Sequence, residues 1–304
     1  MKKIIVAILA TLTSVYANFY NLTPIHITKD ISCVIGDFNP PTKENRGFVS
    51  NICYIDMGDN ITLLDAGPTY NFAKELYTII KKEYPNKKIT NVILSNYHDD
   101  RVLGASYFKE QGATIIGAKS INEDIKNNPQ KFERMKIILP KEVLENTKLI
   151  NADKLVEDGY KIKGSKKTVT ILKLSKTSEE NSDIAIYSKD DNFIFTGNIV
   201  FNGRMLNYTK NSNVDGWIEA LEKISKLNAK YVLGGHGKRY DKESYKPSLD
   251  YLKKLKKAVG KAHSEDIDIT DIKVEKNLLE GIKYYDQLNK HNIRVLYDQL
   301  EWAD

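Results

Sequence analysis

The chain of 304 residues is 28% charged and 41% hydrophobic, with 17 Gly and 8 Pro. This composition is typical of an ordinary globular protein and excludes disordered, collagen-like and coiled-coil chains. The formal charge is +6, but the lysines are scattered among Asp and Glu, and aromatic side chains are not interleaved with them. Nucleic acid is therefore not an expected partner.

The first 17 residues have the pattern of a secretory signal peptide. Lys2 and Lys3 precede a short apolar run, and Val15 and Ala17 stand three residues and one residue before the expected cleavage point. No later stretch approaches the roughly 20 apolar residues that cross a bilayer. We expect the mature protein to be exported, periplasmic or secreted, with no membrane span after cleavage. Losing the two lysines lowers its formal charge to +4.

In chain order, the first half alternates short strands with helices. The apolar spacing of residues 70–84 predicts a helix, and residues 90–95, which contain Val92-Ile93-Leu94, are typical of a buried strand. The polar segment 121–145 is expected to be helical and to overhang any site nearby. The other predicted elements of this half are strands at 31–36, 52–56, 61–65 and 113–117 and a helix at 102–111.

The second half repeats the alternation, which favours layered α/β packing in one domain. Two helix-like stretches close the chain, at 244–262 and 274–302, and an apolar stripe along the second indicates core packing. The other predicted elements are strands at 168–174, 184–187, 193–196 and 231–233 and a helix at 214–227.

The two cysteines, Cys33 and Cys53, lie in two predicted strands joined by a turn-rich segment. In an oxidising compartment such strands can pair and carry a disulfide. Two buried free thiols are the equally weighted alternative. Neither cysteine has a His or a second Cys at metal-ligand spacing, so we do not expect them to bind zinc.

The most informative segment follows the buried strand at 90–95. Asn96, His98 and Asp100 alternate there, so an extended backbone would project all three to one side. The carboxyl ends of strands in open α/β sheets are where ligand sites lie, and a His with a carboxylate suits zinc. Standing alone, the same cluster would be a capped helix start.

Three further turns end predicted strands. Asp65-Ala66-Gly67 and Thr196-Gly197-Asn198 each follow a strand, and His236 follows another strand within Gly234-Gly235-His236-Gly237. Three glycines give His236 no neighbouring side chains to pack against, so packing alone does not explain it.

In order and spacing these turns and the His98-x-Asp100 loop resemble the metallo-β-lactamase superfamily, over nearly all of the mature chain. The resemblance implies an α/β fold, a four-layer αββα sandwich. It implies one domain at 18–304 that includes a C-terminal helical extension at about 243–304. The C-terminal part, with Trp217 and Trp302, looks like the exported branch near sulfur-oxidation and quinoprotein-associated metallohydrolases.

The chain departs from the family's usual His-x-His-x-Asp-His loop, because Asn96 replaces the first His and Arg101 the last. The resulting pattern resembles the mono-zinc, carbapenem-hydrolysing subclass, which completes its site with Asp, Cys and His. The Cys position falls at Ile199, and Asn198 stands where most of the superfamily has a metal-bridging Asp.

The family's third His is also missing, and Glu179 or Glu180 falls nearest to its position. A catalytic zinc site needs about three protein ligands and an open water position. We therefore expect one zinc ion, or none, and not a conventional pair. The predicted ligands are His98, Asp100 and His236, supplemented by Glu179, Asn198 and Asn96.

The leading hypothesis is an exported, zinc-dependent hydrolase with an atypical single-metal site that acts on a small-molecule substrate. Asp100 would ligate the metal or act as a base, and Arg101 would hold an anionic substrate group. The main alternative is a catalytically inactive member that binds a ligand or a protein partner in the periplasm. In that case His98 and Asp100 would only hydrogen-bond each other, and Arg101 would pair with Asp100. A β-lactamase of the mono-zinc subclass is the second alternative, and the missing Cys argues against it.

Overall fold

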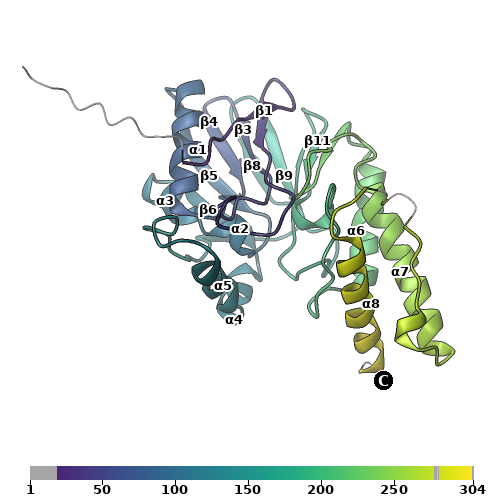
Figure 1. The fold of residues 1–304 in the computed structure, drawn as a ribbon. Helices are drawn as coiled ribbons and strands as arrows, with labels where there is room; N and C mark the ends of the chain where they lie inside the picture. Colours follow the sequence, from purple (N-terminus) through teal and green to yellow (C-terminus); the bar gives the residue numbers. More distant parts are fainter. Residues whose placement is uncertain (1–18, 277–278, 280, 303–304) are drawn as a thin grey trace, which may run out of the picture.

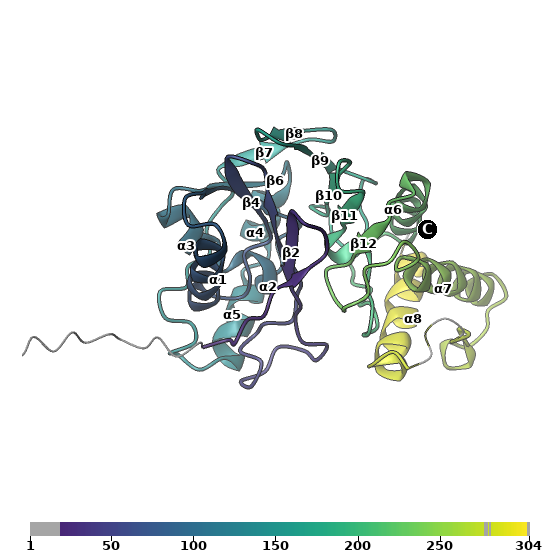
Figure 2. The same cartoon turned by 90° about the horizontal axis from the view of Figure 1, so that it is seen from above.

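A computed structural model describes residues 19–276, 279 and 281–302, so the predicted signal peptide at 1–17 lies outside the described residues. Two β-sheets face each other, and helices cover the outer side of each (Figure 1; Figure 2). The predicted four-layer αββα sandwich is confirmed. In the part of the chain that the structure describes, no helix is long and apolar enough to cross a membrane.

The first sheet follows the chain order β1-β2-β3-β4-β5-β6-β7. Its first strands pair antiparallel, and pairing is parallel from β4 onward, with helices α1 (Tyr70–Glu83) and α3 (Ala105–Glu110) in the connections. The strands are β1 (Ile25–His26), β2 (Ile31–Val34), β3 (Ile52–Asp56), β4 (Asn60–Leu64), β5 (Lys88–Leu94), β6 (Thr114–Ala118) and β7 (Lys154–Val156).

The second sheet has the order β12-β11-β10-β9-β8. Helix α6 (Val214–Leu227) connects the parallel strands β11 and β12 and covers this sheet together with α7 (Lys246–Ser264). Helix α8 (Tyr285–Glu301) packs on α7. The strands are β8 (Lys161–Lys163), β9 (Thr168–Leu172), β10 (Ala185–Ser188), β11 (Phe193–Phe195) and β12 (Tyr231–Leu233).

Strands of the first sheet carry apolar side chains on both faces, and these side chains form a separate apolar cluster on each side of the sheet. In β3, Cys53 and Ile55 belong to the apolar cluster between the two sheets, whereas Ile52 and Tyr54 belong to the cluster beneath the outer helices. Successive strand residues point to opposite faces, so a strand buried on both sides reads as one continuous apolar run. This is the pattern that marks residues 90–95 as a buried strand.

Cys33 and Cys53 are directly opposite each other in the β2–β3 pair and form a disulfide. Both are fully buried between the sheets. Of the two alternatives left open by the sequence, the structure therefore has the disulfide.

Several helix boundaries differ from the predicted ones. The helix expected at 102–111 is instead α3, preceded by the short helix α2 (Asp99–Val102). Between the two helices the backbone nitrogen of Gly104 donates to the carbonyl of Gly67 at 2.9 Å, and a Cβ at Gly104 would lie 2.1 Å from the carbonyl oxygen of Ala66. The helix expected from 274 begins only at Tyr285, after Tyr284 adopts a left-handed φ of 65°. The polar middle segment is helical as predicted, as α4 (Ile121–Asn127) and α5 (Gln130–Ile138).

Candidate functional site

A cleft of about 140 Å³ lies beyond the ends of β5, β11 and β12. Five of the predicted site residues line it: His98, Asp100, Glu179, Asn198 and His236. They come from the turns that follow three different strands and from the segment before β10. The fold therefore brings together side chains far apart in sequence.

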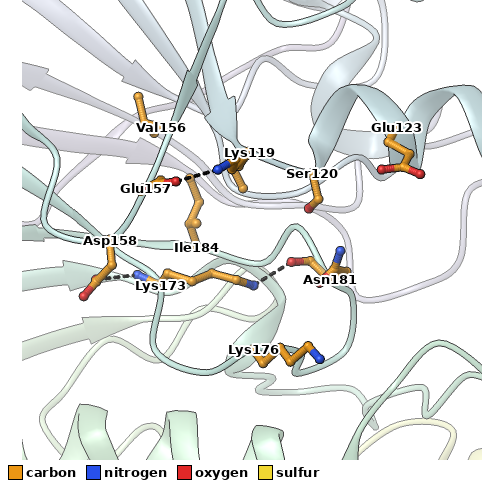
Figure 3. A pocket seen from close by; sticks show the side chains of 11 residues that line it. Lys119, Ser120, Glu123, Val156, Glu157, Asp158, Lys173, Lys176, Asn181 and Ile184 are labelled. Atoms are coloured by element: carbon orange, nitrogen blue, oxygen red, sulfur yellow. Dashed lines mark hydrogen bonds and ion pairs between the residues drawn. The ribbon is translucent and has the colours of Figure 1, made fainter.

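A larger pocket of about 440 Å³ lies where β6 and β7 end, and Figure 3 shows Lys119, Lys173 and Lys176 around it. None of the predicted site residues lines this pocket. The Lys173 ammonium donates to the backbone carbonyls of Asn181 (2.6 Å) and Asp183 (3.1 Å), so it holds the loop before β10. Size alone does not make this pocket the functional site.

His236 is held with one ring nitrogen turned to the cleft. Its Nδ1 lies 2.8 Å from the carbonyl oxygen of Val49, which can only accept, so Nδ1 carries the proton. Nε2 is left with its lone pair, 3.8 Å from Oδ2 of Asp100. Burial, reinforced by Arg204, holds the pKa of His236 well below its usual range, so the ring is neutral.

The glycines around His236 have a steric reason. A Cβ at Gly235 would come within 2.1 Å of Nη2 of Arg101, and one at Gly237 within 2.2 Å of the Asn202 carbonyl oxygen. Gly237 also has a φ of 92°, in the left-handed region that favours glycine. The absence of side chains therefore makes room for a guanidinium and for a backbone turn.

His98 has both ring nitrogens engaged. Nδ1 lies 3.0 Å from Nδ2 of Asn198, an amide nitrogen that can only donate, so Nδ1 accepts. Nε2 then carries the proton and donates to Oε1 of Glu180 at 3.0 Å. Burial opposes the ionisation of Glu180, but its contacts with His98 and Lys131 outweigh it and lower its pKa to about 2.

Asp100 reaches the cleft from a helix and not from an extended chain. The sequence predicted an extended backbone from Asn96 to Asp100. This prediction is wrong, because helix α2 begins at Asp99, directly after His98. Burial opposes the ionisation of Asp100, but Arg101, His236 and His98 hold its pKa well below the usual range. Asp100 is therefore a carboxylate.

Asn96 is fully buried and does not line the cleft. Its Oδ1 accepts from the backbone nitrogen of His98, and its Nδ2 donates to Asp183, each at 3.0 Å. Asp183 also accepts from Ser178 and from the backbone nitrogen of Glu180, each at 2.7 Å. Through these hydrogen bonds Asn96 connects the loop at His98 to the segment that carries Glu179 and Glu180.

Arg101 lies beneath the cleft with its side chain fully buried. Nη1 donates to Asp65 at 2.5 Å, and Nη2 donates to Oδ1 of Asn198. Asp65 also accepts from the backbone nitrogen and hydroxyl of Ser95, at 2.6 and 2.8 Å. The guanidinium therefore hydrogen-bonds Asp65 and not Asp100, and it has no exposed surface on which to hold a substrate group.

Two arginines, Arg134 and Arg204, line the cleft, and no sequence motif singles out either of them. Arg134 pairs with Asp99 at 2.7 Å. The Nε of Arg204 is buried and has no hydrogen-bond partner among the described residues. Burial lowers the pKa of Arg204, partly offset by Asp100 and Glu179. A second unpartnered group is Oε2 of Glu179, where burial raises the pKa to about 7.

Two of the predicted ligands, Asp100 and His236, stand as a pair, whereas Nδ1 of His98 accepts from the Asn198 amide. As the side chains lie, no group of three or more His, Cys, Asp or Glu within residues 19–276, 279 and 281–302 is arranged to hold a metal. Ile199, at the family's Cys position, is buried and does not line the cleft.

Comparison with known proteins gives one consistent family. Residues 45–236 match the family model of the metallo-beta-lactamase superfamily. A curated relative, the metallo-beta-lactamase type 2 of Bacillus sp. (strain 170), is 23% identical over 233 residues, which cover 72% of this chain and 77% of the relative.

Solved structures agree with this match. A metallo-beta-lactamase from Pontibacter korlensis superposes with a TM-score of 0.62 at 16% identity, covering 76% of this chain and 99% of that one. FIM-1 from Pseudomonas aeruginosa, solved in a mono-zinc form, gives 0.61 at 17% identity, covering 78% and 98%. At these identities the likeness is one of fold.

Proposed function

The chain belongs to the metallo-β-lactamase superfamily, and we propose that within it the protein is a hydrolase that uses a single zinc ion to act on a small anionic substrate. The zinc would be held by Asp100, His236 and His98. Bound there, it would supply a Lewis acid and lower the pKa of a water molecule. FIM-1 provides an example of a structural relative with one zinc ion.

The observation that carries the proposal is the orientation of the two histidines. Metal-binding histidines nearly always donate their other ring N–H to a carboxylate or a backbone carbonyl, which fixes the tautomer. His98 donates Nε2–H to Glu180, and His236 donates Nδ1–H to the carbonyl of Val49. Of the remaining nitrogens, Nε2 of His236 keeps its lone pair, whereas Nδ1 of His98 accepts from the Asn198 amide, which a metal would have to displace.

The chain's other groups would orient the substrate. The guanidinium of Arg204 lines the cleft with its Nε unpartnered, and an anionic substrate group would satisfy it. Glu180 keeps His98 in its tautomer, and Arg101 keeps the Asn198 amide oriented toward His98. Arg204 thus takes the substrate-holding role that the sequence suggested for Arg101.

The test is the zinc content of mature protein purified without chelator and dialysed against zinc, measured by mass spectrometry. We expect about one zinc ion per chain, lost in His236→Ala and in Asp100→Asn. His263→Ala, a histidine on α7 outside the cleft, should keep the metal. Zinc-loaded protein would then be screened against anionic esters, thioesters and lactams.

If the protein holds no stoichiometric zinc after loading, the proposal of a zinc-dependent hydrolase is wrong. The favoured function would then be that of a catalytically inactive member that binds a ligand or protein partner. One observation favours this second candidate: the Asn198 amide already occupies Nδ1 of His98 and is itself held by Arg101. Turnover of a chromogenic cephalosporin would instead identify a β-lactamase.

We also propose that the protein works after export, in a periplasmic or extracellular compartment. The Cys33–Cys53 disulfide supports this, since disulfides persist mainly in oxidising compartments. Fractionation of cells that express the full chain tests it. Mature protein shortened by the leader and found outside the cytoplasm is the expected result, and full-length cytoplasmic protein would contradict it.

A further inference from the structure

One wall of the cleft is a loop between β11 and α6, here called the cleft loop (residues 203–212). It contributes Arg204, Asn207 and Thr209 to the cleft lining. None of it lies in a helix or a strand longer than a single bridge. Its position must therefore come from contacts with other parts of the chain.

Helix α8 supplies these contacts with two amide side chains. Asn292, fully buried, accepts from the backbone nitrogen of Tyr208 at 2.8 Å and donates to the carbonyl of Leu206 at 3.1 Å. Gln299 accepts from the Tyr208 hydroxyl at 2.7 Å and donates to the carbonyls of Lys210 and Ser212, each at 3.1 Å. Two side chains on one helix thus engage four backbone groups of the cleft loop.

The residues just before α8 hold the start of the cleft loop and reach the opposite wall. Lys283 donates from its backbone to Gly203 at 3.1 Å and accepts from Met205 at 2.9 Å. The hydroxyl of Tyr284 donates to Asn39 at 2.8 Å, next to Pro40 and Pro41, which line the cleft. The segment before α8 therefore bridges the two walls.

We propose that α8 sets the width of the cleft, with Asn292 and Gln299 as positioning residues that restrict the substrate to a small anion. The restriction follows from size: ligand pockets of drug-sized molecules occupy roughly 300–1,000 Å³, and this cleft has about 140 Å³. The substrate part of the inference rests on the proposed function. The positioning part does not, because it depends only on the contacts between α8 and the cleft loop. The family match ends at residue 236, before α7 and α8.

The test introduces one thiol into the cleft wall, as Asn207→Cys. The chain has two cysteines and both are in the disulfide, so the new thiol is the only free one. Its reaction rate would be measured with a small methanethiosulfonate and with a bulky fluorescein maleimide. The ratio of the bulky to the small rate reports the width of the cleft and not stability.

Adding Gln299→Glu should raise this ratio about tenfold, as expected when hydrogen bonds that keep the loop closed are lost. The substitution keeps the size and the acceptor for Tyr208 but removes both donations to the loop carbonyls. Asn292→Asp is the second variant and removes the donations to Leu206 and to the hydroxyl of Tyr251. Gln287→Glu, on the exposed face of the same helix, is the matched control and should leave the ratio unchanged.

An unchanged ratio in folded Gln299→Glu and Asn292→Asp proteins would overturn the positioning role. The substrate arm uses zinc-loaded protein and anionic substrates of two sizes. Gln299→Glu should lower KM for the bulky substrate relative to the small one, with kcat little changed. If the thiol ratio rises but no zinc binds, the positioning role stands and the proposed hydrolysis fails.

Discussion

Two arginines serve the same site in opposite ways. Arg101 is fully buried, donates to Asp65 and Asn198, and lies out of reach of any ligand. The Nε atoms of both arginines have no hydrogen-bond partner among the described residues, but of the two only Arg204 lines the cleft. Since an unpaired buried donor costs free energy, a charge left unpaired beside a cleft is the one that a ligand can satisfy.

Two neighbouring glutamates repeat the contrast. Glu180 hydrogen-bonds His98 and lies near Lys131, and these contacts overcome the cost of burial and lower its pKa to about 2. In Glu179 burial dominates and raises the pKa to about 7, and its Oε2 is unpartnered. The pKa values of these adjacent glutamates therefore differ because their interaction partners differ, and not because one side chain is more buried than the other.

The largest expected effect is on Arg101. Arg101→Ala would leave Asp65 buried without its cation and should lower the free energy of unfolding by about 3–5 kcal/mol. Urea denaturation measures it, with Arg239→Ala as the control, because Arg239 pairs with Asp241 on the surface. A loss no larger than that of the control would mean that the buried pair is not what stabilises the base of the cleft.

The glutamate pair predicts opposite effects of pH on stability. The pKa of Glu180 is below its unfolded value, so its contribution is complete above about pH 4.5 and is lost as the pH falls toward 2. The pKa of Glu179 is above its unfolded value, so stability is lost as the pH rises from about 4.5 through 7.

Glu180→Gln should therefore weaken the pH dependence of unfolding on the acid side, and Glu179→Gln should weaken it between pH 5 and 8. Each change should be on the order of 1–3 kcal/mol. Urea midpoints at pH 3, 5 and 8 measure both. The same pH dependence in the two variants would remove the contrast between the glutamates.

The smallest expected effect on stability is that of Arg204. Arg204→Ala should leave the free energy of unfolding unchanged or raise it by no more than about 1 kcal/mol, because the variant loses no hydrogen bond of Nε and removes an unpaired buried donor. With an anionic substrate, KM should rise about tenfold at unchanged zinc content, as for one charge-assisted hydrogen bond. A neutral substrate of the same size is the control, and an equal rise in KM for both substrates would contradict a charge-specific role.

The alternation of predicted strands and helices indicated layered α/β packing, and the resemblance to the family implied the four-layer sandwich. The sequence also indicated the strand-end turns that carry His98, Asp100, Asn198 and His236. The helix boundaries were harder, since the backbone nitrogen of Gly104, between α2 and α3, donates to Gly67, which is distant in sequence.

The arrangement of the site was only partly predictable. Alternation suggested that Asn96 joins His98 and Asp100, but the turn into α2 places Asp100 by a helix, and Asn96 hydrogen-bonds Asp183. The sequence suggested that Arg101 holds the substrate, whereas the structure favours Arg204. This difference depends on how deeply each side chain is buried, which no local sequence pattern indicates. Arg204 lies in a loop whose position is determined largely by α8, about 80 residues later in the chain.

The close packing around Gly235 limits which residues this position tolerates. A Cβ at position 235 would lie 2.1 Å from Nη2 of Arg101 and 2.7 Å from the carbonyl carbon of Gly197. The Arg101 side chain could move aside, but the Gly197 backbone excludes a Cβ whatever residue stands at position 101. A library that varies position 235 should therefore recover glycine alone, even where position 101 is varied with it.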